Sequence, residues 1–358
     1  MAAGSWFDWT TGDLVTEAKF QDIQDSILFI YASDAAANSA LTNKVEGTVY
    51  FNTTDDILKV WDGSAWIEVG GGLDAFEVSY LVIGGGGSGG SSNVTNNAAA
   101  GGGAGGYRNN YASETSGNSS STEDNMFLEK SVNYTVTIGA GGGGAYANTL
   151  PSERDGNDSY FSSIISLGGG GAGALTSAGW RPRDLVEKGA GGGTAEGGGR
   201  TLGKLTQGGD GGTGASEAGG GGGGASGDGG NASSGVGGNG ANGLSSSITG
   251  SAVTRAAGGG GGGNPTVGTG GTGGGGDGRI GADAYAGTAN TGSGGGGVYL
   301  GGGSAKSGGN GGSGIVIIRY ATADATISVG GGLTYSSATD GTDTVVTFTA
   351  GTDTISFS

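Results

Sequence analysis

Glycine runs that begin or end beside strand-like segments limit, more than any other feature, how this chain can fold. In residues 76–87 (FEVSYLVIGGGG), an alternating apolar segment leads directly into four glycines. Its period of two is typical of a half-buried strand, with three apolar side chains on one face: Val78, Tyr80 and Val82. The same transition recurs, once in reverse order, at 132–144, 160–171 and 308–320. We therefore expect a β scaffold in which strands continue into glycine-rich segments and glycine-rich segments lead back into strands.

Composition excludes several classes of protein. The chain has 93 glycines but only 3 prolines in 358 residues, so neither a collagen repeat nor a proline-rich linker fits. Its formal charge of −17 opposes binding to nucleic acid or to an anionic membrane surface. Cysteine and histidine are absent from the sequence, which removes thiol and imidazole catalysis and the usual metal ligands. We therefore expect no enzymatic activity, no cofactor, no metal site and no nucleic-acid partner.

Residues 1–72 differ from the rest of the chain because they hold four of the five tryptophans. Three strands are predicted here as a β-meander, at 48–52, 57–61 and 66–69. Thr16 suits the start of a helix, and apolar residues follow it at helical spacing: Phe20, Ile23, Ile27 and Ile30. This helix either packs on its own module or joins a short inter-subunit bundle. We interpret 1–72 as a separate module for attachment or oligomerisation.

The glycine runs are able to form extended helices with three residues per turn. Because glycine has no Cβ, neighbouring backbones can approach such a helix from all sides. The six-residue runs 219–224 and 258–263 would each span about 19 Å. Ordering one residue costs roughly 1–2 kcal/mol while a backbone hydrogen bond returns about 1 kcal/mol, so these rods need strands at their ends. The competing interpretation is a disordered linker.

The segments between the glycine runs hold the candidate binding residues. Trp180 lies beside Arg181 and Arg183, and an aromatic face with adjacent guanidinium donors suits a sugar ring. Tyr107, Tyr111 and Tyr146 are further candidates on other predicted loops. These loops are expected to meet at a common tip. The alternative for Trp180 is a hydrophobic plug that covers the end of the glycine lattice.

Three parts of the chain resemble known proteins. Residues 45–69 (VEGTVYFNTTDDILKVWDGSAWIEV) closely resemble a segment found in many bacteriophage tail-fibre and other appendage proteins. Residues 80–87 (YLVIGGGG) and 312–320 (GSGIVIIRY) resemble the opening and closing strands of the glycine-rich domain of phage fibre and receptor-binding proteins. Residues 346–357 are similar to strands that accompany that domain.

The resemblance implies a fold that is mainly β and irregular. A small N-terminal helix and β-meander would precede a glycine-rich sandwich of polyglycine II-type helices bounded by β-strands. This second domain would cover residues 73–358, and its C-terminal strands in 321–358 would complete the β scaffold.

The resemblance also implies a virion appendage, either a tail fibre or a fibre-tip adhesin. Such a protein is made in the host cytoplasm, is displayed on the virion and joins other virion proteins through residues 1–72. It binds a host cell-surface glycan or outer-membrane receptor through its loops, and it forms a homo-oligomer, with a trimer favoured. The alternative is a purely structural virion protein, such as a fibre spacer or a neck or head decoration, without a receptor site.

Overall fold

The computed structural model describes residues 29–54, 57–68, 75–144, 154–173, 175–176, 179–180, 188–195 and 201–358. The chain divides into two compact units, residues 1–74 and residues 75–358. Each unit has its own hydrophobic core, and each is described separately below.

The first unit is a small mixed sheet with one short helix. Its strands are ordered β1 (Phe29–Tyr31), β2 (Val49–Asn52), β3 (Ile57–Trp61) and β4 (Trp66–Glu68). β1 is parallel to β2, whereas β2, β3 and β4 form an antiparallel meander. Helix α2 (Asp34–Ala40) begins at Ser33, whose hydroxyl accepts a hydrogen bond from the backbone N–H of Ala36 at 3.2 Å. The buried core consists of Ala37, Tyr50 and Trp66.

This unit confirms the predicted meander but changes the helical part. The three predicted strands are present, and their ends differ from the prediction by at most one residue. Ile30, the last member of the predicted helical stripe, lies in strand β1 and is 65% exposed. The rest of that stripe, including Phe20, Ile23 and Ile27, lies outside the described residues. Helix α2, which lies among the described residues, was not predicted, because its sequence DAAANSA has no apolar stripe.

The second unit contains a nearly closed antiparallel sheet that resembles a barrel. Its strands are ordered β11 (Ile164–Ser166), β10 (Ser159–Phe161), β9 (Tyr134–Thr137), β21 (Asp343–Phe357), β18 (Ile315–Ala321), β5 (Ala75–Ile83) and β7 (Tyr107–Asn109). Strand β21 joins the two halves because its first part pairs with β18 and its second part with β9. Strands β19 (Ile327–Val329) and β20 (Leu333–Asp340) also pair with β21. Strand β8 (Met126–Glu129) pairs with the beginning of β5.

Hydrophobic side chains fill both sides of the central strands β5 and β18. The larger core cluster lies within the barrel and includes alternate residues of β5: Phe76, Val78, Tyr80 and Val82. The opposite face of β5 contributes Leu81 and Ile83 to a second cluster, together with Tyr107 and Ile248. The predicted half-buried alternation therefore holds only at the beginning of β5, and from Leu81 onwards both faces are buried.

Of two other predicted strands, one differs from the prediction and one agrees with it. The segment 160–166 is not one strand, because the chain reverses at Ser162, whose φ is +52°, and forms the β10–β11 hairpin. The strand predicted at the start of 132–144 is observed as β9. The remaining short elements lie along the glycine-rich part: β6 (Asn97–Ala98), η1 (Gly117–Ser119), β12 (Leu175–Thr176), β13 (Gly179–Trp180), β14 (Leu244–Ser246), β15 (Val253–Arg255), β16 (Arg279–Ile280) and β17 (Val298–Leu300).

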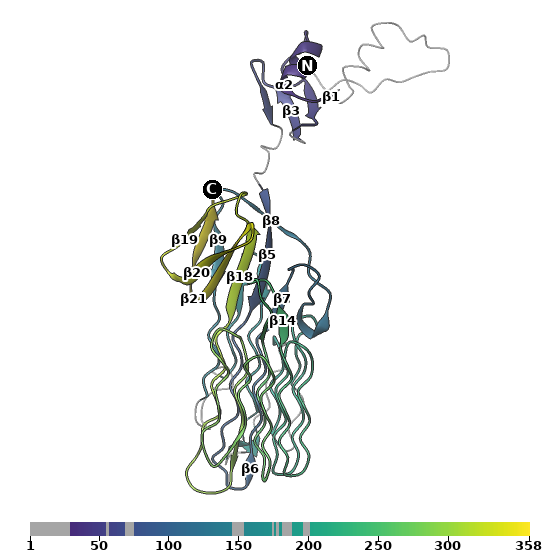
Figure 1. The fold of residues 1–358 in the computed structure, drawn as a ribbon. Helices are drawn as coiled ribbons and strands as arrows, with labels where there is room; N and C mark the ends of the chain where they lie inside the picture. Colours follow the sequence, from purple (N-terminus) through teal and green to yellow (C-terminus); the bar gives the residue numbers. More distant parts are fainter. Residues whose placement is uncertain are drawn as a thin grey trace, which may run out of the picture. The chain divides into compact units, whose positions relative to one another are not determined.

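Glycine tracts run from the barrel to an opposite end of this unit, where β6 lies (Figure 1). We call this the distal end. The tracts are ordered by backbone hydrogen bonds that repeat every three residues. In tract 219–224, Gly219 and Gly222 donate to tract 259–262 while Gly220 and Gly223 donate to tract 191–194. Gly221 donates to Gly230 in a third tract. Successive amides of one tract thus bond three different neighbours.

Tract 99–106 lies inside this lattice with six neighbouring tracts. Its amides donate to tracts 167–170, 220–223 and 292–295. Its carbonyls accept from tracts 84–90, 190–193 and 259–262. The disordered-linker interpretation is therefore wrong for the described tracts, because their donors and acceptors are paired within the domain.

The close spacing of the tracts explains the need for glycine. A Cβ added at Gly102 would lie 2.2 Å from the carbonyl oxygen of Gly87, and one added at Gly222 would lie 1.9 Å from that of Gly102. Both distances are shorter than any Cβ contact that a folded backbone tolerates. The lattice therefore excludes side chains at these positions.

Candidate functional site

The distal end is built from a small sheet and a shared tyrosine. Strands β16, β17 and β6 pair in that order, and Figure 1 shows β6 at the far end of the glycine tracts. Tyr299 of β17 is buried, and its hydroxyl accepts a hydrogen bond from Asn264 Nδ2 at 3.2 Å. The same hydroxyl lies 3.4 Å from Asn96 Oδ1 and 3.5 Å from Glu217 Oε2. Tyr299 therefore connects three turns that are distant in sequence.

An exposed aromatic and cationic pair lies beside this sheet. The Arg279 guanidinium of β16 sits 4.9 Å from the centre of the Tyr285 ring, and Tyr285 is 55% exposed. The backbone carbonyl of Tyr285 accepts from the N–H of Gly296, two residues before β17, so the lattice fixes this segment. A ring with an adjacent guanidinium can stack on a sugar ring or hold an anionic group.

The predicted site residues do not all lie at one end. Trp180 lies in β13, whose backbone pairs with β12. That hairpin follows the tract ending at Gly173, which lies beside Gly90 at the distal end. Arg181, Arg183 and Tyr146 lie outside the described residues.

Tyr107 and Tyr111 are at the barrel end instead. Tyr107 of β7 is fully buried in the second core cluster, so its ring is not available to a receptor. Tyr111 is half-buried and lies under the Arg319 guanidinium, which is 5.4 Å from its ring centre. The expectation of a common tip is therefore wrong for these two loops, because β7 belongs to the barrel wall.

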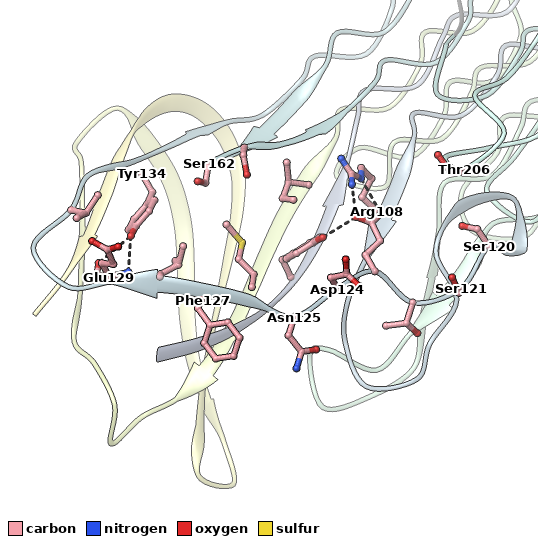
Figure 2. A pocket seen from close by; sticks show the side chains of 18 residues that line it. Arg108, Ser120, Ser121, Asp124, Asn125, Phe127, Glu129, Tyr134, Ser162 and Thr206 are labelled. Carbon is pink, nitrogen blue, oxygen red and sulfur yellow. Dashed lines mark hydrogen bonds and ion pairs between the residues drawn. The ribbon is translucent and has the colours of Figure 1, made fainter. Parts of the chain in front are cut away.

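A groove opens in the barrel wall where β8 and β11 fail to meet. We call it the seam groove: it has a volume of about 920 Å³ and is lined mainly by residues 120–129 and 162–164 with Tyr80, Arg108 and Tyr134. Figure 2 shows Phe127 and Asn125 on one side of the groove and Ser162 on the other. This volume falls within the range of small-molecule and peptide sites.

A partly buried polar network forms one end of the seam groove. Glu123 accepts two hydrogen bonds from Arg108, one of them from Nε at 2.9 Å, and a third from the Tyr80 hydroxyl at 2.8 Å. Burial, followed by the Glu123 charge, raises the pKa of Tyr80, so its hydroxyl stays protonated and donates. The bond to Glu123 raises the pKa of Arg108. The guanidinium and the carboxylate thus neutralise each other.

Gln207 closes the wall just beyond this network. Its Oε1 accepts from the backbone N–H of Leu167 at 2.9 Å, and its Nε2 donates to the carbonyl of Ile165 at 3.2 Å. Its own carbonyl accepts from the N–H of Tyr107 at 3.0 Å. Gln207 therefore joins β7, through its backbone carbonyl, to the end of β11, through its side chain.

The described residues contain no group of three acidic side chains placed to hold a metal ion. Within the same ranges, no helix has both the length and the apolar composition needed to cross a membrane.

Comparison with known families identifies the second unit. A family described as the glycine-rich domain matches residues 66–321, more than half of the chain. The protein belongs to the glycine-rich domain family. The matched range begins at Trp66 in β4, within the first unit, and ends at Ala321, the last residue of β18 in the second unit. Strands β19, β20 and β21 follow it, and β21 supplies the strand between β18 and β9. Neither the curated proteins nor the solved structures gave a match.

Several key residues of the glycine-rich domain were not found from the sequence. Tyr299 follows four glycines and Val298, which resembles the strand transitions recognised elsewhere, so this signal was available. Tyr285 lies between two alanines, and a local reversal of the chain, which the sequence does not announce, brings the Arg279 side chain to its ring. No local sequence pattern marks Gln207 or Arg108 as a functional residue. Their roles depend on strands that are about 40 and 57 residues away in sequence.

Proposed function

We propose that the protein is an appendage of a phage virion whose distal end binds a receptor on the host cell surface. The first support is the lattice. Its three-residue repeat of hydrogen bonds, with six neighbours around tract 99–106, is the pattern expected of packed polyglycine II helices. Such a lattice would act as a rigid shaft, because successive residues of a tract are held by different neighbouring tracts.

The observation that carries the binding role is the Arg279–Tyr285 pair on the distal end. Exposed tyrosine and arginine are the side chains most often found at binding hot spots. They stand on a framework tied together by Tyr299, so little conformational freedom would be lost on binding. A host surface glycan suits this pair because the ring offers a stacking face and the guanidinium offers donors for hydroxyl or acidic groups.

The first unit would then serve for attachment. Its exposed apolar side chains include Ile30 and Ile67, at 65% and 48%. Contact with other virion proteins, or with further copies of the chain in a homotrimer, would cover such residues. This role follows the resemblance of residues 45–69 to the virion-proximal part of fibre proteins.

The proposed receptor site is tested by replacing two exposed tyrosines that lie at opposite ends of the second unit. Purified protein should bind host cells, and Tyr285→Ala should weaken this binding by about tenfold or more, as expected for a hot spot contributing ~1.4 kcal/mol. Tyr335→Ala is the matched control, because Tyr335 is 47% exposed but lies on β20 of the barrel. Equal binding by both variants would remove the pair from the site. No binding by the unaltered protein would favour the alternative, a structural spacer.

A further inference from the structure

The seam groove is bounded by two strand edges that have no strand partner among the described residues. On one side, β8 pairs with β5 only, and on the other side β11 pairs with β10 only. A free strand edge offers backbone N–H and C=O groups to any extended chain that reaches it. Arg108 and Gln207 use part of the β11 edge by bonding the Ile165 carbonyl.

The backbone of Phe127 faces into this gap. The Tyr134 hydroxyl accepts from the N–H of Glu129 at 2.7 Å and donates to its carbonyl at 3.1 Å, so these groups point away from β5. Backbone groups two residues apart in a strand point the same way. The N–H and C=O of Phe127 therefore also face the groove, and no hydrogen bond to either is found among the described residues.

The rest of the groove combines an apolar floor with an acidic rim. Leu128 is buried in the barrel core, while Met126 and Ile164 pack against that core. Asp124, two residues before β8, and Glu129, the last residue of β8, form no ion pair within the described part of the chain. Arg108, in contrast, is neutralised by Glu123. Figure 2 shows Asp124 and Glu129 at different places along the groove. The local charge therefore favours a cationic ligand.

We propose that the seam groove binds an extended, basic peptide segment of a partner protein, which adds as a short strand to the edge of β8. Hydrogen bonds to the backbone of Phe127 supply the pairing, as in other cases of strand addition. Alternate side chains of the peptide enter the groove towards the apolar floor, and the intervening lysines or arginines meet Asp124 and Glu129. This site is separate from the distal end and does not depend on the proposed receptor.

The test uses a capped hexapeptide of alternating lysine and valine, labelled for fluorescence anisotropy, with the full-length protein. Phe127→Pro removes the N–H that faces the groove but leaves the ladder with β5, because that N–H does not bond β5. Phe127→Ala is the matched control, since it removes the exposed ring and keeps the backbone donor. We expect the peptide to bind the unaltered protein and Phe127→Ala alike, and to bind Phe127→Pro at least about tenfold more weakly.

Two further measurements test whether charge and backbone pairing account for the binding of the peptide. The Asp124→Asn/Glu129→Gln double variant should weaken binding, and a glutamate–valine hexapeptide should not bind. If Phe127→Pro does not fold, the lysine–valine peptide with methylated backbone nitrogens replaces it, and this peptide should lose affinity. The proposal is overturned if the lysine–valine peptide fails to bind, if Phe127→Pro binds it as well as Phe127→Ala, or if a neutral oligosaccharide binds the groove in its place.

Discussion

A single methyl group added inside the lattice should be strongly destabilising at one glycine and harmless at another. Gly222→Ala would place a Cβ 1.9 Å from the carbonyl oxygen of Gly102. Gly173→Ala is the control, because its Cβ would lie 3.5 Å from the nearest atom, the N of Ala195, which is ordinary van der Waals contact. Both glycines lie in hydrogen-bonded tracts, so the comparison isolates the packing of the backbones.

The size of the effect follows from the geometry. Relief of the clash at Gly222 requires a movement of about 1 Å, because real Cβ contacts are not shorter than 3.0 Å. Overpacking of this kind costs roughly 1–3 kcal/mol, and each hydrogen bond lost between tracts adds about 1 kcal/mol. Alanine restricts the unfolded chain, which offsets roughly 0.4–1 kcal/mol. With one such bond lost, the free energy of unfolding should therefore fall by about 1–4 kcal/mol for Gly222→Ala.

The assay is calorimetric unfolding of the full-length protein. At roughly 2–4 °C per kcal/mol for a domain of this size, Gly222→Ala should lower the Tm of the second unit by about 2–16 °C. Gly173→Ala should leave the Tm unchanged or raise it slightly, because only the effect on the unfolded chain remains. Equal Tm values for the two variants would refute the lattice reasoning, since the tracts would then tolerate side chains.

Two further predictions concern the order of the tracts and the pH dependence of the first unit. Amide hydrogen exchange in 219–223 and 258–262 should approach the protection of strand β18, because these amides are paired within the lattice; exchange at random-coil rates would contradict it. Burial acts to raise the pKa of Asp34, but hydrogen bonds from Lys59 and Tyr50 bring it below 3.8 overall. The resulting stability is present above about pH 4 and is lost as the pH falls through the folded pKa. Thermal unfolding followed by tryptophan fluorescence should show this loss, and Asp34→Asn should abolish it.

The strands were predictable where one local pattern decided them. The meander of the first unit and strands β5 and β18 have apolar periodicity and turn signals within ten residues, and they lie close to where the sequence places them. Helix α2 was missed because its alanine-rich sequence presents no stripe, and it is defined instead by the Ser33 cap and the contact of Ala37 with Tyr50 and Trp66. The reversal at Ser162 carries no glycine or proline signal.

The candidate sites were less predictable than the strands. Tyr107 has the composition of a binding residue, but its position in β7 of the barrel wall buries it completely. The Arg279–Tyr285 pair is formed by a local chain reversal that leaves no sequence motif. The edge of β8 depends on which distant segments become neighbours. Local patterns report the conformation of a segment, whereas a site is defined by contacts between distant segments.

The sequence by itself determined that this chain has a tryptophan-containing N-terminal unit, a β scaffold and glycine tracts that need close backbone neighbours. Glycine content fixes this requirement because only glycine lacks a Cβ. The absence of histidine and cysteine from the sequence excludes imidazole and thiol chemistry. Only the tertiary structure decided which tract neighbours which, how β21 joins the two halves of the barrel, and where the wall stays open. Glycine runs are nearly identical in sequence, so their pairing is set by the strands and turns at their ends.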